Sequence, residues 1–309
     1  MSLSRFLVQV QAVGTALAAE RVVNFVLVLI LARGLGAEGF GLYATALSVA
    51  GLLEYLLDMG LSPVITRRAA REPASVWSWL PRVAQLKALL MAVCALAVAG
   101  VTTFASSHET LPLAAALAVG GLGCFSIGES FAAVLAGLQR FGEKSAWLIS
   151  YRLANLAGLA LSLHLGVSSV PVLMAVTVGL SALYAGLLGF WVARALPFRR
   201  GDASSREGWP ALVREGFPFI VGNVLSSVPM HLPTVAVSAG VGLAAAGEFQ
   251  IAQKLFFALG MIPGAVGTVA FSHMAAKAGA FPSEAWGRYH QGNGLRLLVG
   301  IWAGRGLAR

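Results

Sequence analysis

The chain has 309 residues, of which 58% are hydrophobic and only 11% are charged, and its mean hydropathy is +0.79. Soluble domains carry about 25% charged residues, so this composition excludes an ordinary soluble protein and predicts that the chain lies in a bilayer. The formal net charge is +9. Its cations gather in alternate loops, which is typical of membrane topology, so we expect no nucleic-acid partner.

Eight apolar runs are long enough to cross a bilayer, because a membrane helix needs about 20 mostly apolar residues. The predicted fold class is therefore all-α, a polytopic transmembrane helix bundle. A ninth run begins near Leu295 and ends short of spanning length, so we expect a C-terminally truncated chain: a fragment, a frameshifted product or a naturally short form. The eight runs cover residues 9–32, 40–62, 84–105, 112–137, 146–166, 171–193, 215–238 and 246–272.

Lysine and arginine in the short loops predict the orientation, because cytoplasmic loops are enriched in both. If the N-terminus is cytoplasmic, the inner loops hold nearly all the loop cations, and Arg33 is almost alone outside. We therefore expect a multi-pass membrane protein with its N-terminus inside. The inner-loop cations are Arg67, Arg68, Arg71, Arg82, Arg140, Lys144, Arg194, Arg199, Arg200, Arg206, Lys277 and Arg288.

A weak internal repeat divides the chain. Gly41-Leu42-Tyr43-x-x-Ala46 follows the first run, and Gly247-Glu248-Phe249-x-x-Ala252 follows the seventh. A parallel repeat of six helices would place them at equivalent positions. The predicted domains are a first six-helix half at 1–197, a cytoplasmic linker at 198–214 rich in Gly, Ser and Pro, and an incomplete second half at 215–309.

Cations within the runs are candidate substrate-binding residues, because ionisable groups cost a few kcal/mol each to insert into a bilayer. Arg21 lies near the middle of its run, where its guanidinium either binds a phosphate bidentately or pairs with Glu54 or Glu129. Lys254 either faces the same central cavity, which we favour, or pairs with Glu248.

Carboxylates within the runs are candidates for ion coupling or gating. Glu54 and Asp58 are four residues apart and share a helix face, so they could bind a cation or take up a proton. Asp58 lies near the inner interface, where Arg67 or Arg68 is an alternative partner. Glu129 and Arg152 both lie toward the cytoplasmic side, as an inner gate pair or as ordinary helix pairing.

The sequence has no pattern typical of an enzyme. It lacks a Walker lysine-serine pair, a metal-spaced His and Cys cluster and a nucleophile elbow. The glycines of GLGAEG at 34–39 follow a bilayer-length run and not a short strand, so they predict an outer turn and not a phosphate loop. We expect no enzymatic activity, no metal site and no cofactor, with Na⁺ or H⁺ as a candidate coupling ion.

The segment ARGLGAEGFGLYATALSVAGLLEYLLDMGLSPVITRRAARE at 32–72 resembles helices 1–2 of the bacterial polysaccharide transporter family, the Wzx-like oligosaccharide flippases. That family belongs to the larger group that includes the MATE drug exporters and the lipid II flippases. The elements that carry the resemblance are Ala32-Arg33, Leu35-Gly36, Glu38-Gly39-Phe40-Gly41-Leu42-Tyr43, Asp58-Met59-Gly60-Leu61, Arg67-Arg68 and Ala69-Ala70-Arg71.

The resemblance implies a fold of twelve to fourteen helices in two halves, in the bacterial plasma membrane. Such a protein moves a lipid-diphosphate-linked oligosaccharide, a precursor of O-antigen, capsule or exopolysaccharide, to the outer leaflet by alternating access. Central cations would meet the diphosphate, and Arg21, Lys254 and Arg152 are the candidates for that role. The implied partners are this substrate, the bilayer, and polysaccharide polymerase or glycosyltransferase machinery.

Two other functions stay open. Glu54, Asp58 and Glu129 would suit a MATE-like cation-coupled exporter, although the helix 1–2 motif is closer to the polysaccharide branch. The short ninth run would suit a non-transporting scaffold or an inactive relative. The coupling ion, Na⁺, H⁺ or neither, is open in each transporting case.

Overall fold

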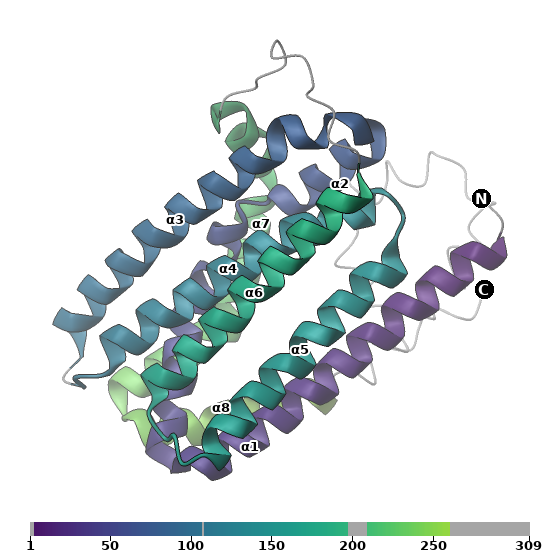
Figure 1. The fold of residues 1–309 in the computed structure, drawn as a ribbon. Coiled ribbons are helices and arrows are strands. Elements are labelled where there is room, and N and C mark those ends of the chain that lie inside the picture. Colours follow the sequence, from purple (N-terminus) through teal and green to yellow (C-terminus); the bar gives the residue numbers. More distant parts are fainter. Residues whose placement is uncertain (1–2, 107, 197–208, 260–309) are drawn as a thin grey trace, which may run out of the picture. The chain divides into compact units, whose positions relative to one another are not determined.

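The computed structural model describes residues 3–106, 108–196 and 209–259, and in these ranges all the regular structure is helical (Figure 1). This confirms the predicted all-α bundle. Residues Met1–Leu255 form one compact unit, and the contacts reported below lie within it. The helices are α1 (Leu3–Asp58), α2 (Leu61–Arg71), α3 (Val76–Ala105), α4 (Leu111–Gly137), α5 (Phe141–His164), α6 (Val170–Ala195), α7 (Trp209–Gly240) and α8 (Leu243–Leu259), with a 3₁₀ turn at Pro73–Ser75.

Helix α1 contains the first two predicted spans, joined by a sharp bend at Gly36. This residue has φ 69° and ψ −179°, a conformation open in practice only to glycine. The two arms fold back on each other, since Asn24 on the first and Glu54 on the second line one pocket. The Gly-rich segment is therefore the tight turn that its sequence predicted.

Helix α2 continues from the second arm of α1 after a tight left-handed turn at Met59 and Gly60. The carboxylate of Asp58 accepts hydrogen bonds from the hydroxyl of Ser62, at 2.6 Å, and from its backbone N–H, at 3.4 Å. It thereby satisfies a donor in the first turn of α2, which is the work of a helix cap. The family-like Asp-Met-Gly-Leu sequence thus forms a tight turn in which the Asp58 carboxylate binds the first turn of α2.

Helix α4 lies among α1, α2, α3 and α6 and packs against all four. Small residues allow this close packing. A Cβ added to Gly128 would lie 2.6 Å from the ring of Tyr184 on α6, and one added to Gly123 would overlap the side chain of Met91 on α3. The glycines of this apolar run are therefore contact points between helices.

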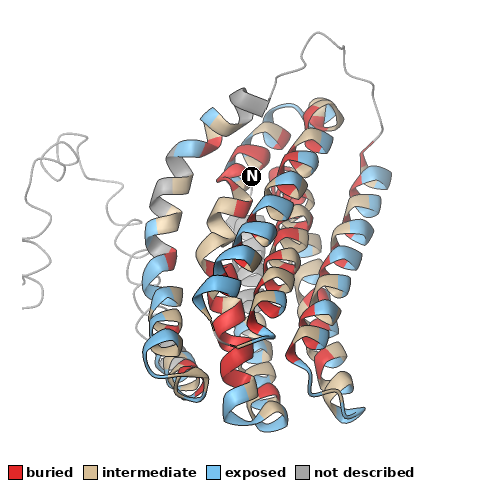
Figure 2. Cartoon of the chain, turned by 90° about the vertical axis from the view of Figure 1, so that its left-hand side faces the viewer, coloured by how far each residue is buried: buried red, intermediate tan, exposed pale blue. Residues whose placement is uncertain are grey.

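The described residues contain five segments that are long and apolar enough to cross a membrane. The first of them holds both arms of the α1 hairpin. Exposed positions recur along the helices (Figure 2). Many of them are large apolar residues, and Phe104 is 93% exposed and Leu96 75% exposed. Acyl chains are the natural contact for such a surface. The segments are Ala19–Arg71, Pro73–Ala105, Leu111–Gly137, Phe141–His164 and Val170–Ala195.

Several predicted features lie outside the described residues. They are the linker up to residue 208, the eighth run beyond residue 259, and the whole ninth run. Helix α7 begins at Trp209, a few residues before the run predicted at 215–238. The division into halves at 1–197, 198–214 and 215–309 stays a prediction.

Candidate functional site

A pocket of about 250 Å³ lies among both arms of α1 and helices α4, α5, α7 and α8. Much of its wall is apolar and comes from α1, for example from Leu27, Leu31 and Leu47. The arrangement suits a ligand that is in part apolar and in part charged or hydrogen-bonding. The ionisable and polar side chains of the wall, tyrosine apart, are Asn24, Ser48, Glu54, Arg152, His231, Gln250 and Lys254.

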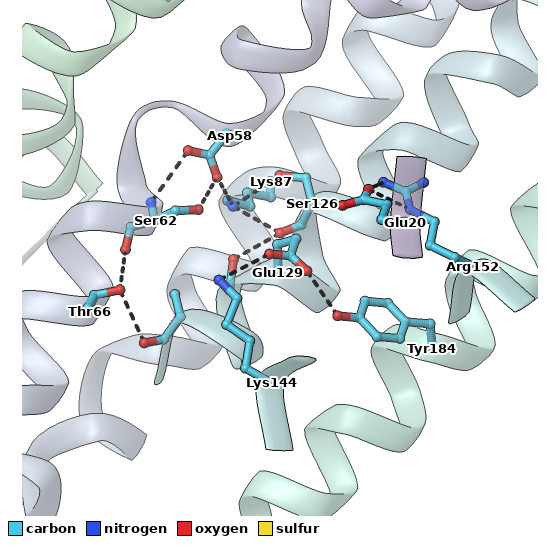
Figure 3. A network of polar contacts seen from close by, with 12 residues as sticks. Glu20, Asp58, Ser62, Thr66, Lys87, Ser126, Glu129, Lys144, Arg152 and Tyr184 are labelled. Carbon is cyan, nitrogen blue, oxygen red and sulfur yellow. Dashed lines mark hydrogen bonds and ion pairs between the residues drawn. The ribbon is translucent and has the colours of Figure 1, made fainter. Parts of the chain in front are cut away.

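Arg152 on α5 is the cation with the most defined surroundings (Figure 3). Its Nη2 lies 2.6 Å and its Nε 2.9 Å from Oε1 of Glu20. The guanidinium also lies over the rings of Phe125 and Tyr151, 5.0 and 5.4 Å from their centroids, which adds cation–π attraction. A guanidinium has five N–H donors, so the pair with Glu20 leaves donors for a ligand.

Helices α7 and α8 supply the opposite side of the pocket. The hydroxyl of Thr234 donates to Oε1 of Gln250 at 2.8 Å and joins the two helices. His231 packs so closely on Gly51 of α1 that a Cβ there would lie 2.6 Å from its Nδ1. Lys254 has no ion-pair partner among the described residues, so its charge is available to a ligand.

The structure gathers three of the six predicted site residues, Glu54, Arg152 and Lys254, around this pocket. Arg21 is exposed on α1, three residues before Asn24, and is not one of the lining residues. The cations that line the pocket with Glu54 are therefore Arg152 on α5 and Lys254 on α8, both far from α1 in sequence.

Glu129 lies outside the pocket lining and belongs to a separate contact chain (Figure 3). Its Oε2 lies 3.6 Å from Nζ of Lys144, and its Oε1 accepts a 3.0 Å hydrogen bond from the hydroxyl of Tyr184. Arg152 binds Glu20 instead. The two residues considered as a gate pair thus have different partners in this structure.

Asp58 also lies outside the lining, and its partner is Lys87 on α3. Nζ of Lys87 is 2.9 Å from Oδ1 of Asp58 and 3.0 Å from both the carbonyl and the hydroxyl oxygen of Ser126 on α4. Sequence reasoning missed Lys87, because a lysine near the end of an apolar run resembles an ordinary interfacial cation. The sequence did place the two residues at the same depth in the membrane, because Asp58 lies near the end of one apolar run and Lys87 near the start of the next.

Comparison with known proteins agrees with this architecture. Residues 10–275 match the family model described as polysaccharide biosynthesis protein. No curated protein and no solved structure matches the chain. Since the matched residues are most of the chain, it belongs to the polysaccharide biosynthesis protein family, the family of Wzx-like polysaccharide transporters, and it is a multi-pass membrane protein.

Proposed function

We propose that the chain flips a lipid-diphosphate-linked oligosaccharide from the inner to the outer leaflet of the plasma membrane by alternating access. One observation carries the proposal: a pocket among the helices has cations on two walls, Arg152 on α5 and Lys254 on α8. A diphosphate drawn through a bilayer needs such counter-charge, because an isolated charge in hydrocarbon is costly.

The proposed roles follow from the chemistry of each group. Arg152 binds phosphate oxygens through the fork of its guanidinium, and Lys254 supplies a point charge from the other wall. Arg21 extends the cationic path along α1 toward its N-terminal end. The side chains of Asn24 and Gln250, which line the pocket, offer hydrogen bonds to sugar hydroxyls.

Glu54 favours ion coupling within the same proposal. Its carboxylate lines the pocket with the two cations, so a bound Na⁺ or H⁺ would change the charge that the substrate meets. The same observation supports the second candidate, a MATE-like cation exporter. The proposal also includes a cytoplasmic N-terminus, a precursor glycan as the cargo, and a partnership with polymerase or glycosyltransferase machinery.

The first prediction concerns the two pocket cations. In a strain that lacks its own flippase, we expect Arg152→Ala and Lys254→Ala to lower surface polysaccharide, and the double variant to abolish it. Each lost charge-assisted hydrogen bond weakens phosphate binding by roughly 10- to 100-fold, from about 1.5–3 kcal/mol. Surface polysaccharide is measured with membrane levels of the protein matched by immunoblot.

Arg194→Ala is the control, because Arg194 stacks on Phe190 with its guanidinium carbon 4.4 Å from the ring centroid and does not line the pocket. We expect it to complement fully. Full complementation by both pocket variants and by their combination would overturn the proposal. If Glu54→Gln abolished efflux of a cationic dye but left surface polysaccharide intact, the exporter would be the better function.

A further inference from the structure

We propose that a second site, at the cation-rich end of the bundle, binds the phosphate of a lipid headgroup. The site is a pocket of about 280 Å³ between the end of α2, the start of α3 and the start of α7. None of its lining residues lines the central pocket. Its wall consists of Arg67, Arg68, Arg71, Glu72, Ser75, Ser78, Trp79 and Glu215, so three guanidinium groups face two carboxylates.

The amphipathic sequence of α2 creates the cationic wall. Leu61, Ile65 and Ala69 are buried against the bundle, which leaves the opposite face of the helix open. Arg67 and Arg71 are both exposed, and their spacing of four residues places them one turn apart on that face. Two guanidinium groups thus border the same pocket.

Glu215 forms a close ion pair with Arg68 and a longer one with Arg67, and it leaves Arg71 unpaired among the described residues. Its Oε2 lies 3.1 Å from Nε and 3.0 Å from Nη2 of Arg68, and 3.8 Å from Nη2 of Arg67. The side chain of Arg67 is 51% exposed, and Arg71 has no hydrogen bond or ion pair within the described part of the chain. Arg67 and Arg71 therefore keep donors free for an anion.

The remaining wall contains one further carboxylate, that of Glu72, beside groups that favour an anion. The first turn of α3 faces the pocket, and the N-terminus of a helix carries a partial positive charge. The hydroxyl of Ser78 donates to the carbonyl of Ser75 at 2.6 Å, and Nε1 of Trp79 donates to the hydroxyl of Ser75 at 3.4 Å. These donors are already occupied, so the two arginines would hold the ligand.

The position of the pocket selects a lipid phosphate. Tryptophan is enriched at the level of lipid headgroups, and Trp79 lines this pocket near the start of a helix long and apolar enough to cross a membrane. Arginines bind phosphate oxygens bidentately, and basic pockets at a helix-bundle end are suited to anionic headgroups. Phosphatidylglycerol and a polyprenyl diphosphate carry this chemistry equally.

The test measures lipid binding to the purified full chain by native mass spectrometry in detergent. We expect dihexanoyl phosphatidylglycerol to bind more tightly than dihexanoyl phosphatidylcholine. The double variant Arg67→Gln/Arg71→Gln should weaken phosphatidylglycerol binding by about tenfold or more, as expected when charge-assisted bonds to phosphate are lost. Glu215→Gln should strengthen it, because one of the two carboxylates that line the pocket is gone.

Arg194→Gln is the matched control, since it removes one cation from the same end of the bundle but outside this pocket. Competition with farnesyl diphosphate identifies the source. If farnesyl diphosphate displaces phosphatidylglycerol and the double variant loses both ligands, the site receives the diphosphate lipid. If farnesyl diphosphate does not compete, the site holds bulk phospholipid. Equal binding of the two phospholipids, or an equal loss in Arg194→Gln, would overturn the proposal. Because the measurement does not depend on transport, its result tests the lipid site independently of the proposed flipping.

Discussion

At the residue scale, the Asp58–Lys87 pair explains why two charges are tolerated within an apolar bundle. The side chain of Lys87 is 1% exposed and that of Asp58 20% exposed. The ammonium of Lys87 donates to one oxygen of Asp58 and two oxygens of Ser126, and these three acceptors replace water. Loss of Lys87 would leave the mostly buried carboxylate of Asp58 without its counter-charge, with only Ser62 among the described residues as a hydrogen-bond partner.

We therefore predict that Lys87→Met destabilises the protein by about 3–5 kcal/mol, the typical effect of breaking a buried pair. Thermal unfolding in detergent measures the change. Lys144→Met is the comparison, since Lys144 and Glu129 are 32% and 22% exposed and lie 3.6 Å apart; we expect about 1 kcal/mol or less. The double variant Lys87→Met/Asp58→Asn should recover part of the loss, and unchanged stability in Lys87→Met alone would contradict the argument.

At the element scale, glycines set the distance between α1 and the helices of the predicted second half. A Cβ added to Gly41 would overlap the carbonyl oxygen of Leu243, and one added to Gly247 would lie 3.0 Å from the backbone nitrogen of Gly41. The two glycines of the sequence repeat thus touch each other.

Gly41→Ala should therefore push α8 away from α1 or strain the backbone, at a cost of about 1–3 kcal/mol as in other overpacked cores. We expect a lower Tm in detergent and reduced complementation. Gly100→Ala is the control, because a Cβ there meets nothing within 4 Å and alanine favours a helix over glycine by roughly 1 kcal/mol. Equal Tm values for the two variants would show that the contact between α1 and α8 can accommodate a methyl group at Gly41.

At the scale of the whole molecule, charge is distributed unevenly between the two ends of the bundle. The end that holds α2 also holds the loop between α4 and α5 and the end of α6 (Figure 1). It carries Arg67, Arg71, Arg82, Arg140, Lys144 and Arg194, whereas the opposite end carries Arg33 with Glu38 and Glu109. The positive-inside rule predicts that the basic end faces the cytoplasm.

Cysteine labelling tests this orientation in intact cells. With Cys94 and Cys124 replaced by Ala, we expect a membrane-impermeant maleimide to label Glu109→Cys and Ser168→Cys. Ala74→Cys and Gly142→Cys, exposed positions at the basic end, should react only after permeabilisation. The reverse pattern would place the N-terminus outside.

The six spans up to residue 193, the α1 hairpin and the family could be predicted from the sequence, because each depends on local properties. Run length decides what crosses a bilayer, the Gly-rich segment around Gly36 permits the turn, and the segment at 32–72 carries the family resemblance. Glu54, Arg152 and Lys254 could be named as candidates for the same reason, since a charge within an apolar run is visible in the sequence.

The partners of those charges were decided only by the tertiary structure. Arg152 binds Glu20 across 132 positions of sequence, and Lys87 binds Asp58 across 29. Arg21, chosen for its depth in the first run, lies outside the pocket lining. Depth along a helix follows from sequence position, but the direction of a side chain depends on which helices become neighbours and how each is rotated. Helix neighbours and helix rotation depend on contacts between helices, such as that of Gly41 with Gly247, and cannot be derived from the sequence of one helix.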